Sequence, residues 1–505
     1  MKVNQKRAKR GNFYLFRIIY FRKAKNKEKL QDEGMKKFCK NYRENLAVFS
    51  ERLRVNSSFD LIKRKLSVLG EEVSFFYIDG FIKDGEMQRI MQNLLSMKRL
   101  PSADELLMKL PYVEVEGTHS IDKAIRAVLS GQAVIIGETF EDVAILIDAR
   151  TYPARNTEEP DSDRVMQGSH DGFVETLVSN TALIRRRIRD TRLTMEHFDM
   201  GGASKTDVVV CYMSGVASEA VVRAVREKLL LAKPKSLTLG FQSLAESLIK
   251  KGWINPFPKI RSTERPDTAA AQLIEGSVLV ICDNSPQVMI LPTSIFHFLE
   301  ETDDYYFPPL TGTYLRLVRI AILLLSVVIT PLWYLCIEYA DFLPDSLKFI
   351  LPDNPGALPV ILQLFLVEFA IDGLKIASMN TPDMLSNSLS IVGALILGDF
   401  AVEIGWLSPD VILYMAFVAI ANFAQQNHEL GFAFKFMRMI ILLLTYLLGV
   451  WGFGIGILIF IIAVATNNTV TGRRYLYPLI PFDIRALMHL ITRRKKGDFE
   501  KEREG

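Results

Sequence analysis

The sequence has few of the residues that cross-link small domains or hold metal ions. Its 505 residues include four cysteines and six histidines, and neither set has disulfide-like or metal-ligand spacing. The cysteines are Cys39, Cys211, Cys282 and Cys336. We therefore expect unpaired thiols in a reducing compartment, with no disulfide framework and no metal site.

Motifs of catalysis and of nucleotide binding are also missing. The glycines form neither a phosphate-binding P-loop nor a dinucleotide fingerprint, and no nucleophile elbow is found. Asp79 and Asp84 lie beside Gly80 and Gly85, which is more typical of a turn and a helix cap than of an acid–base pair. The sequence predicts a protein that is not an enzyme, with no catalytic residues and no cofactor.

The N-terminus lacks a cleavable secretion signal and is strongly basic. Its apolar stretch, Asn12–Phe21, is short, contains Arg17 and is followed by more charge. Residues 1–45 contain 15 Lys and Arg against 4 Asp and Glu, and a basic cluster, Arg493–Lys496, lies near the other end. Basic flanks of spanning segments normally stay in the cytoplasm, so we expect both termini there. We expect this basic leader to bind anionic lipid rather than nucleic acid.

Long apolar segments dominate the second part of the chain, from about residue 315 to 467. The clearest is Leu315–Ile337, whose charges, Arg316 and Arg319, both lie at its start. About twenty apolar residues suffice to cross the hydrocarbon core of a bilayer as a helix. Residues 1–310 have ordinary soluble composition. The sequence therefore predicts a membrane protein with a large cytoplasmic head.

The head contains a weak internal repeat of strand and helix patterns. Val73–Leu95 and Val208–Leu230 each resemble a strand, a glycine turn and an amphipathic helix. Ile121–Asp148 and Asp267–Pro292 each resemble a helix, a glycine and two strands. The aligned glycines of the two halves are Gly80 with Gly215, and Gly131 with Gly276.

This repeat predicts an α/β head of two related subdomains, followed by an α-helical polytopic membrane domain. Each subdomain would be a small sheet with helices covering one face. The expected boundaries are a basic leader at 1–58, subdomains at 59–172 and 173–310, the membrane domain at 311–470 and a basic cytoplasmic tail at 471–505.

Acidic residues interrupt the apolar segment Leu358–Asn380. Leu364, Glu368 and Asp372 fall at i, i+4 and i+8, along one stripe of a helix. A carboxylate in the hydrocarbon layer is costly and normally faces protein or water. Two interpretations follow: a helix lying flat at the interface with its acidic face wet, or a helix whose stripe lines a cation path.

Two further acids and a glycine-rich apolar stretch complete the membrane segments. Asp399 and Glu403 are spaced i, i+4 near the end of Ser386–Trp406 and are expected at or near an interface. A single span over Met439–Thr466 would leave the basic tail outside. Its central glycines suggest instead a bend and a re-entrant hairpin: Gly449, Gly452, Gly454 and Gly456. Four crossings plus this hairpin, or five crossings, are the two alternatives.

Four long motifs carry a resemblance to a known family. They are Asp171–Asp190, Asn255–Thr293, Leu407–Tyr414 and Tyr475–Phe482. The chain resembles the A-subunit class of the GerA family of spore germination proteins, from about residue 60 to 490. The basic leader is not part of that family pattern.

The resemblance implies a spore inner-membrane protein with a cytoplasmic two-part head and other germination membrane subunits as partners. It also implies a homo-oligomeric ring that conducts cations, lined by Leu364, Glu368 and Asp372. We therefore expect a cation-channel subunit acting in spore germination. The alternatives are a receptor or scaffold subunit without a pore, and an accessory role in the movement of dipicolinic acid.

Overall fold

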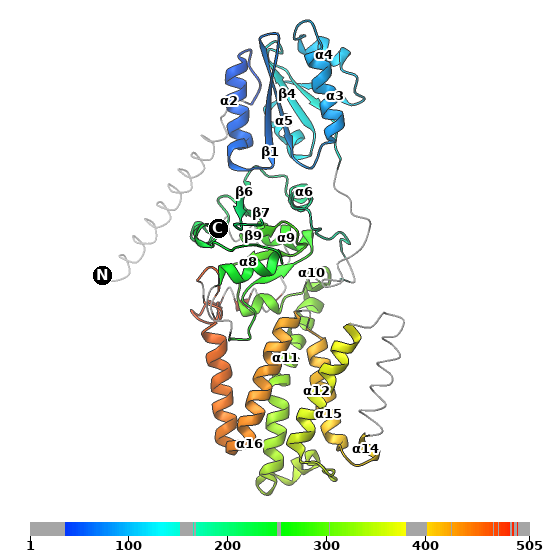
Figure 1. Ribbon diagram of the computed structural model, residues 1–505, viewed down its shortest axis with the longest axis vertical. Helices are drawn as coiled ribbons and strands as arrows, with labels where there is room; N and C mark the ends of the chain where they lie inside the picture. The colour runs from blue at the N-terminus through cyan, green and yellow to red at the C-terminus, as the bar shows by residue number, and fades with distance from the viewer. Residues whose placement is uncertain are drawn as a thin grey trace, which may run out of the picture. The chain divides into compact units, whose positions relative to one another are not determined.

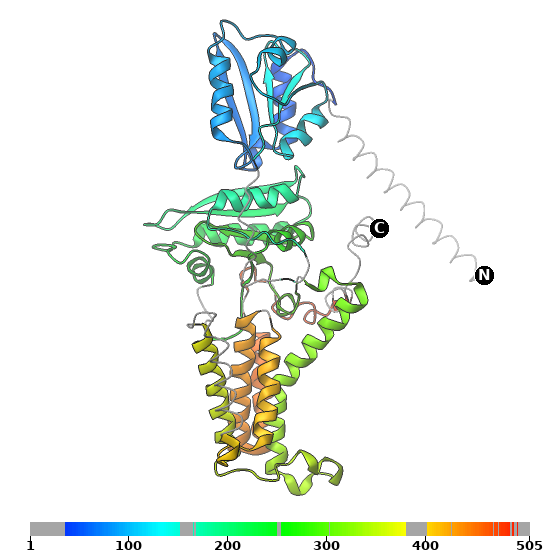
Figure 2. The same ribbon diagram turned by 90° about the vertical axis from the view of Figure 1, so that its right-hand side faces the viewer.

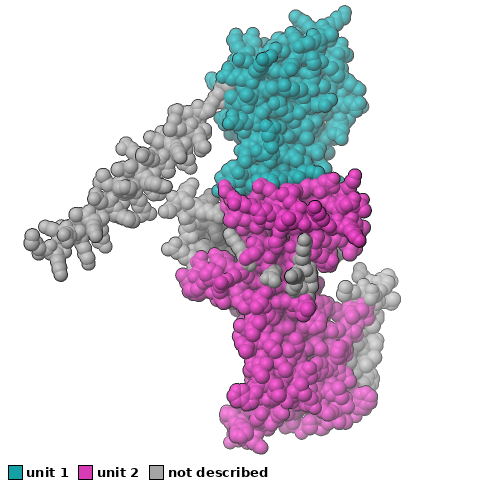
Figure 3. Space-filling view, turned by 60° about the vertical axis from the view of Figure 1, so that its left-hand side comes forward, with its two compact units in different colours: residues 1–154, 176–197, 211–215 teal, residues 155–175, 198–210, 216–505 magenta. Residues whose placement is uncertain are grey.

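The structure is a computed structural model of the whole chain. It describes residues 36–151, 165, 168–249, 254–301, 303–379, 401–425, 427–467, 469–472, 474–484, 487, 488 and 492. Most of the basic leader, Asp399 and the cluster Arg493–Lys496 lie outside these residues. The chain divides into two compact units (Figure 3): unit 1 is residues 1–154, 176–197 and 211–215, and unit 2 is residues 155–175, 198–210 and 216–505.

Unit 1 is built on a five-stranded sheet in the order β1-β2-β4-β5-β3 (Figure 1). The strands pair antiparallel throughout. Their bounds are β1 Leu61–Val68, β2 Glu71–Ile78, β3 Val115–Thr118, β4 Ala133–Gly137 and β5 Ala144–Ile147.

Helices cover both faces of this sheet. Phe75 and Phe76 are neighbours on β2, and successive strand residues point to opposite faces. Phe76 packs with α2 (Tyr42–Leu53) and α5 (Ile121–Leu129), whereas Phe75 packs with α3 (Asp84–Leu95) and α4 (Ala103–Lys109). The expectation that helices cover one face is wrong here, since an apolar run such as that of β2 is buried from both sides.

Capping side chains explain where two of these helices begin. The Ser102 hydroxyl accepts a hydrogen bond from the backbone N–H of Glu105 at the start of α4. The Ser120 hydroxyl accepts one from the backbone N–H of Lys123 at the start of α5. Each serine satisfies an N–H group that has no partner within its helix.

The second sheet repeats the first, with the order β6-β7-β9-β10-β8. Its strands are β6 Leu193–Met200, β7 Thr206–Met213, β8 Arg261–Thr263, β9 Val278–Cys282 and β10 Val288–Leu291. The aligned glycines adopt matching positive φ angles: 78° at Gly80 and 79° at Gly215, 93° at Gly131 and 97° at Gly276. The repeat in the sequence is therefore a repeat of strand order and of turns that favour glycine.

Helices and short turns connect these strands. The α-helices are α6 Leu177–Arg187, α7 Glu219–Leu231, α8 Phe241–Leu248, α9 Pro266–Ile274 and α10 Asp303–Tyr306. The 3₁₀ turns are η1 Val55–Ser57, η2 Ile295–Phe298, η3 Ala340–Phe342 and η4 Asp345–Ile350.

Apolar helices form a bundle in unit 2 (Figure 2). The described members are α11 Pro309–Glu338, α12 Val360–Met379, α14 Ala401–Glu403, α15 Pro409–Phe423 and α16 His428–Ala465. Helix α11 packs against α15 and α16, and α12 packs against α15. By length and composition, α11 and α16 could each cross a membrane.

Helix α16 bends back on itself at Gly449, where φ is 57° and ψ is −134°. Its two arms pack together, with the rings of Phe434 and Phe460 5.6 Å apart. A Cβ on Gly456 would lie 2.9 Å from the Cα of Ile441, so the second arm needs a glycine at this contact. The expected bend is confirmed. The first arm, residues 428–448, is about 31 Å long at about 1.5 Å per residue. This arm is longer than the short half-helix expected of a re-entrant hairpin, because about 30 Å is the thickness of a whole hydrocarbon core.

Replacing Gly449 by alanine is expected to lower the stability of the hairpin by about 1–3 kcal/mol. The backbone there suits glycine alone, and a Cβ would lie 2.5 Å from the Tyr339 hydroxyl. The thermal unfolding midpoint of the protein in detergent measures the effect. Gly454→Ala is the matched control, because a Cβ there meets no atom within 4 Å. Equal midpoints for both variants would contradict the role of Gly449.

Candidate functional site: a charged cluster between apolar helices

Helix α12 turns its acidic stripe toward the protein. Leu364 is 1% exposed and Glu368 is 5% exposed, and Asp372 is half-buried. On the opposite side of the helix, Leu362 and Phe369 are exposed. The burial of Glu368 does not agree with an interfacial helix whose acidic face is wet.

Two cations on the first arm of α16 meet these carboxylates. The guanidinium of Arg438 donates to both oxygens of Glu368, at 2.7 and 2.8 Å. The ammonium of Lys435 forms an ion pair with Asp372 and lies 3.4 Å from Glu368. Arg438 also donates to the backbone carbonyl of Ser326 on α11, at 3.3 Å. The cluster thus ties α12, α16 and α11 together.

The formal charges of this cluster cancel. Two carboxylates and two cations are held in an apolar bundle, where an isolated charge would cost several kcal/mol in lost hydration. One guanidinium nitrogen of Arg438, Nη2, donates to both carboxylate oxygens of Glu368, so both oxygens have a partner. Pairing therefore explains how carboxylates are held on a helix as apolar as α12.

A third cation, Lys375, lies beside the cluster. Its ammonium is 4.7 Å from the ring centre of Phe432 and 5.9 Å from that of Phe423. A cavity of about 20 Å³ is lined by Lys375, Asp372 and Lys435, among other residues. This volume holds about one water molecule.

Gln363 positions the start of α12. Its amide nitrogen donates to the carbonyls of Pro355 and Leu358, at 2.5 and 2.7 Å. Its amide oxygen accepts from the backbone N–H of Ser408, at 2.8 Å. Ser408 in turn caps α15. A single buried side chain therefore joins the loop before α12 to the start of α15.

The structure does not bring the other predicted acids into this cluster. Glu403 ends the short helix α14 and is exposed, and Asp399 lies outside the described residues. Sequence reasoning missed Lys435 and Arg438, which resembled a basic flank before a long apolar stretch. The available signal was their i, i+3 spacing, which places both cations on one face of an apolar helix. Glu368 and Asp372, spaced i, i+4, likewise share one face of theirs.

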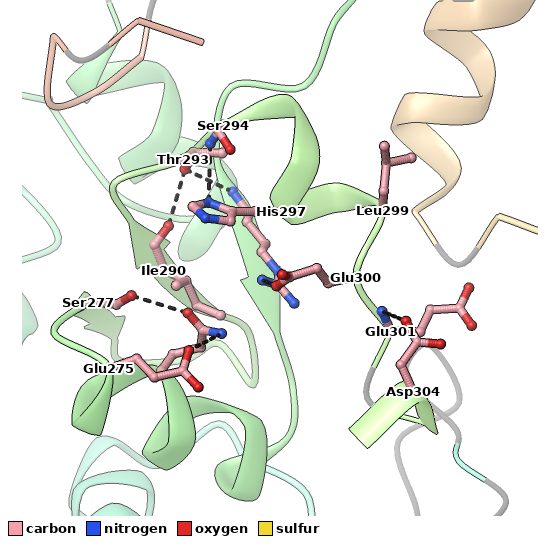
Figure 4. A network of polar contacts seen from close by, with 12 residues as sticks. Glu275, Ser277, Ile290, Thr293, Ser294, His297, Leu299, Glu300, Glu301 and Asp304 are labelled. Carbon is pink, nitrogen blue, oxygen red and sulfur yellow. Dashed lines mark hydrogen bonds and ion pairs between the residues drawn. The ribbon is translucent and has the colours of Figure 1, made fainter. Parts of the chain in front are cut away.

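A second charged cluster holds the start of α11, and Figure 4 draws its carboxylates, Glu300, Glu301 and Asp304. Arg316 Nε lies 3.3 Å from an oxygen of Asp304, which is fully buried, and Arg319 lies 3.1 Å from the same carboxylate. Arg316 also lies 3.6 Å from Glu300, and Arg319 pairs with Glu301. These pairs connect α11 to the segment that follows the second sheet.

Two thiols of the head are buried within strands. Burial raises the pKa of Cys282 on β9 to about 12. Burial, together with the carboxylate of Asp60, also raises the pKa of Cys211 on β7. Both thiols therefore stay protonated near neutral pH. Within the described ranges, no three His, Cys, Asp or Glu side chains are grouped as metal ligands.

The chain is similar in sequence to proteins of bacterial spores. The model of the Bacillus/Clostridium GerA spore germination protein family matches residues 49–504. Stage V sporulation protein AF of Bacillus subtilis (strain 168) is 37% identical over 90% of this chain and 93% of its own length. Spore germination protein KA of the same organism is 27% identical over 87% of this chain and 82% of its own length.

Among solved structures, one similar chain is the N-terminal domain of the A subunit of the Bacillus megaterium spore germinant receptor GerK3. It is 20% identical in sequence, with a TM-score of 0.37, and the match covers 51% of this chain and 97% of that domain.

Proposed function

Because this chain belongs to the GerA family of spore germination proteins, we propose that it is a cation-channel subunit acting in spore germination. Its relatives are spore germination and sporulation proteins, which supports a role in germination. Copies of the chain would assemble into a ring in the spore inner membrane, together with other germination subunits. The head and both termini would face the cytoplasm.

The observation that carries the proposal is the cluster of Glu368, Asp372, Lys435 and Arg438. Ionisable side chains inside a membrane layer are rare, and they commonly mark ion pathways. Here four of them gather between α12 and α16. Leu364, Glu368 and Asp372 are the proposed lining residues of the path.

The neutral cluster corresponds to a closed state in this proposal. Carboxylates select cations by replacing lost hydration and repelling anions. A carboxylate paired with Lys435 or Arg438 does neither, because its charge is already cancelled. Conduction therefore requires a second packing in which these pairs separate, and opening is a shift of population toward that packing.

Removing the carboxylate charges tests conduction. Glu368→Gln combined with Asp372→Asn is expected to lower cation conductance and selectivity in planar bilayers while the oligomer still forms. The matched control is Glu403→Gln with Asp341→Asn, which removes two carboxylates that are exposed and lie outside the cluster. Unchanged single-channel current and selectivity in the cluster variant would contradict the pore.

A subunit that anchors and docks without conducting is the second candidate. It is favoured by one observation: the buried cluster is satisfied within a single chain, as a packing role requires. Cysteines substituted one at a time along Val360–Ile376 separate the two candidates. A stripe accessible to a water-soluble thiol reagent supports a path, and uniform protection supports packing.

A further inference from the structure

A polar cavity of about 330 Å³ lies within unit 2, next to the start of α16. Its walls include β8, the end of η2 with Glu300 shortly after it, and Asn427, His428 and Glu429 at the start of α16. His297 and Glu300, two of its lining residues, are drawn in Figure 4. The volume is at the lower end of the range found for small-molecule sites. It suits a compact metabolite rather than a nucleotide.

Carboxylates outnumber cations in the lining. Glu264, Glu300 and Glu429 face a single guanidinium, that of Arg261, which is 3.3 Å from Glu300. Glu300 is further neutralised by Arg316, at 3.6 Å.

The other two carboxylates differ from Glu300 in their partners. Glu264 accepts a hydrogen bond from the amide of Gln287, at 3.3 Å. Over the described part of the chain, neither Glu264 nor Glu429 forms an ion pair with a protein cation. The cavity therefore holds two carboxylates without a cationic partner.

We propose that this cavity binds a small aliphatic amine carrying one or two ammonium groups. Ammonium groups would complete the ion pairs that Glu264 and Glu429 lack. Glu264 is half-buried and Glu429 is exposed, so water and salt screen part of this attraction. The hydroxyls of Ser262, Thr268 and Ser285 add hydrogen-bond acceptors to the same wall.

The location of the cavity gives such a ligand a structural consequence. Glu300 belongs to the ion-pair network that holds α11 through Arg316, and Glu429 lies in the first turn of α16. An amine that pairs with Glu264 and Glu429 joins the start of α16 to the segment after β8, in a cavity whose wall also includes Glu300. Its binding therefore stabilises the packing seen in this structure.

Three probes of equal length and different charge test the proposal on the full chain in detergent. Calorimetry at pH 7.5 with 1,4-diaminobutane, 1,4-butanediol and succinate is expected to show binding of the diamine alone. Glu264→Gln with Glu429→Gln should weaken diamine binding by at least tenfold, since each lost charged contact is worth about that factor. The control is Glu219→Gln with Glu227→Gln, which removes two exposed carboxylates of α7 outside the cavity and should bind like the natural chain.

Three results would overturn the proposal. Equal binding of the diol would show that charge is irrelevant, and stronger binding of succinate would reverse the expected sign. Equal loss in the α7 control would show general attraction of the diamine to surface carboxylates. None of these measurements involves ion conduction, so their failure and the failure of the channel proposal are separate results.

Discussion

Replacing Arg185 by methionine is expected to lower the free energy of unfolding of unit 1 by about 3–5 kcal/mol. Arg185 on α6 is fully buried, and its guanidinium donates to both oxygens of Asp60, at 2.8 and 3.1 Å. It also donates to the Ser58 hydroxyl and to the carbonyls of Asp190 and Leu193, each at 3.1 Å. Methionine fills a similar volume but donates no hydrogen bond, so Asp60 would be left as a buried, uncompensated charge.

Hydrogen exchange of the β1 and β2 amides in the full chain measures this loss. A loss of 3 kcal/mol corresponds to roughly a 150-fold rise in exchange through unfolding. Arg192→Met is the matched control, because its ion pair with Asp190 is largely exposed and should contribute less than about 1 kcal/mol. Adding Asp60→Leu to the Arg185 variant should recover much of the loss. A single variant as protected as the control would refute the assignment.

The sequence does not show which of the arginines around Arg185 is buried. Three consecutive arginines, Arg185 to Arg187, stand at the end of a predicted helix and look equivalent in the sequence. The structure buries Arg185 and exposes Arg186. Which of them turns inward depends on the rotation of α6 against β1, and that rotation is decided by contacts with residues more than 120 positions away.

The internal repeat was predictable because its key positions constrain the backbone strongly. A positive φ angle strains residues that carry a Cβ, so the four aligned glycines mark the same turns in both sheets. The strand order then follows from two copies of one pattern. Coverage of both sheet faces was missed because an apolar run shows that a strand is buried but does not show by which helices.

Only the acidic residues of the charged cluster could be predicted from the sequence. The acids at Glu368 and Asp372 stood out because they interrupt an apolar helix at one spacing. Their partners, Lys435 and Arg438, are more than 60 residues further along, and the pairing depends on the register of α12 against α16. Each half was therefore interpreted alone, the acids as a cation path or a wet interfacial face and the cations as a membrane flank.

Replacing Arg438 by methionine is expected to destabilise the helix bundle of unit 2 by about 3–5 kcal/mol. Glu368 is buried and would lose both charged hydrogen bonds, while Lys435 remains 3.4 Å away. The thermal midpoint in detergent measures the change. Lys375→Met is the matched control, since Lys375 contacts aromatic rings and its loss should cost about 0.5–2 kcal/mol. A midpoint no lower than that of the control would contradict the assigned pair.

The pair can also be removed as a unit, which separates stability from conduction. Glu368→Leu with Arg438→Met replaces two charges by apolar side chains and should recover most of the thermal midpoint, because neither charge is left unpaired. If Glu368 lines a cation path, this double variant regains stability yet conducts poorly, since the carboxylate that would select cations is gone. If the cluster only packs α12 against α16, the double variant regains stability and germination function together. Germination of spores that carry each variant therefore decides between the channel and the anchor, and the recovered midpoint ensures that a functional loss is not a folding loss.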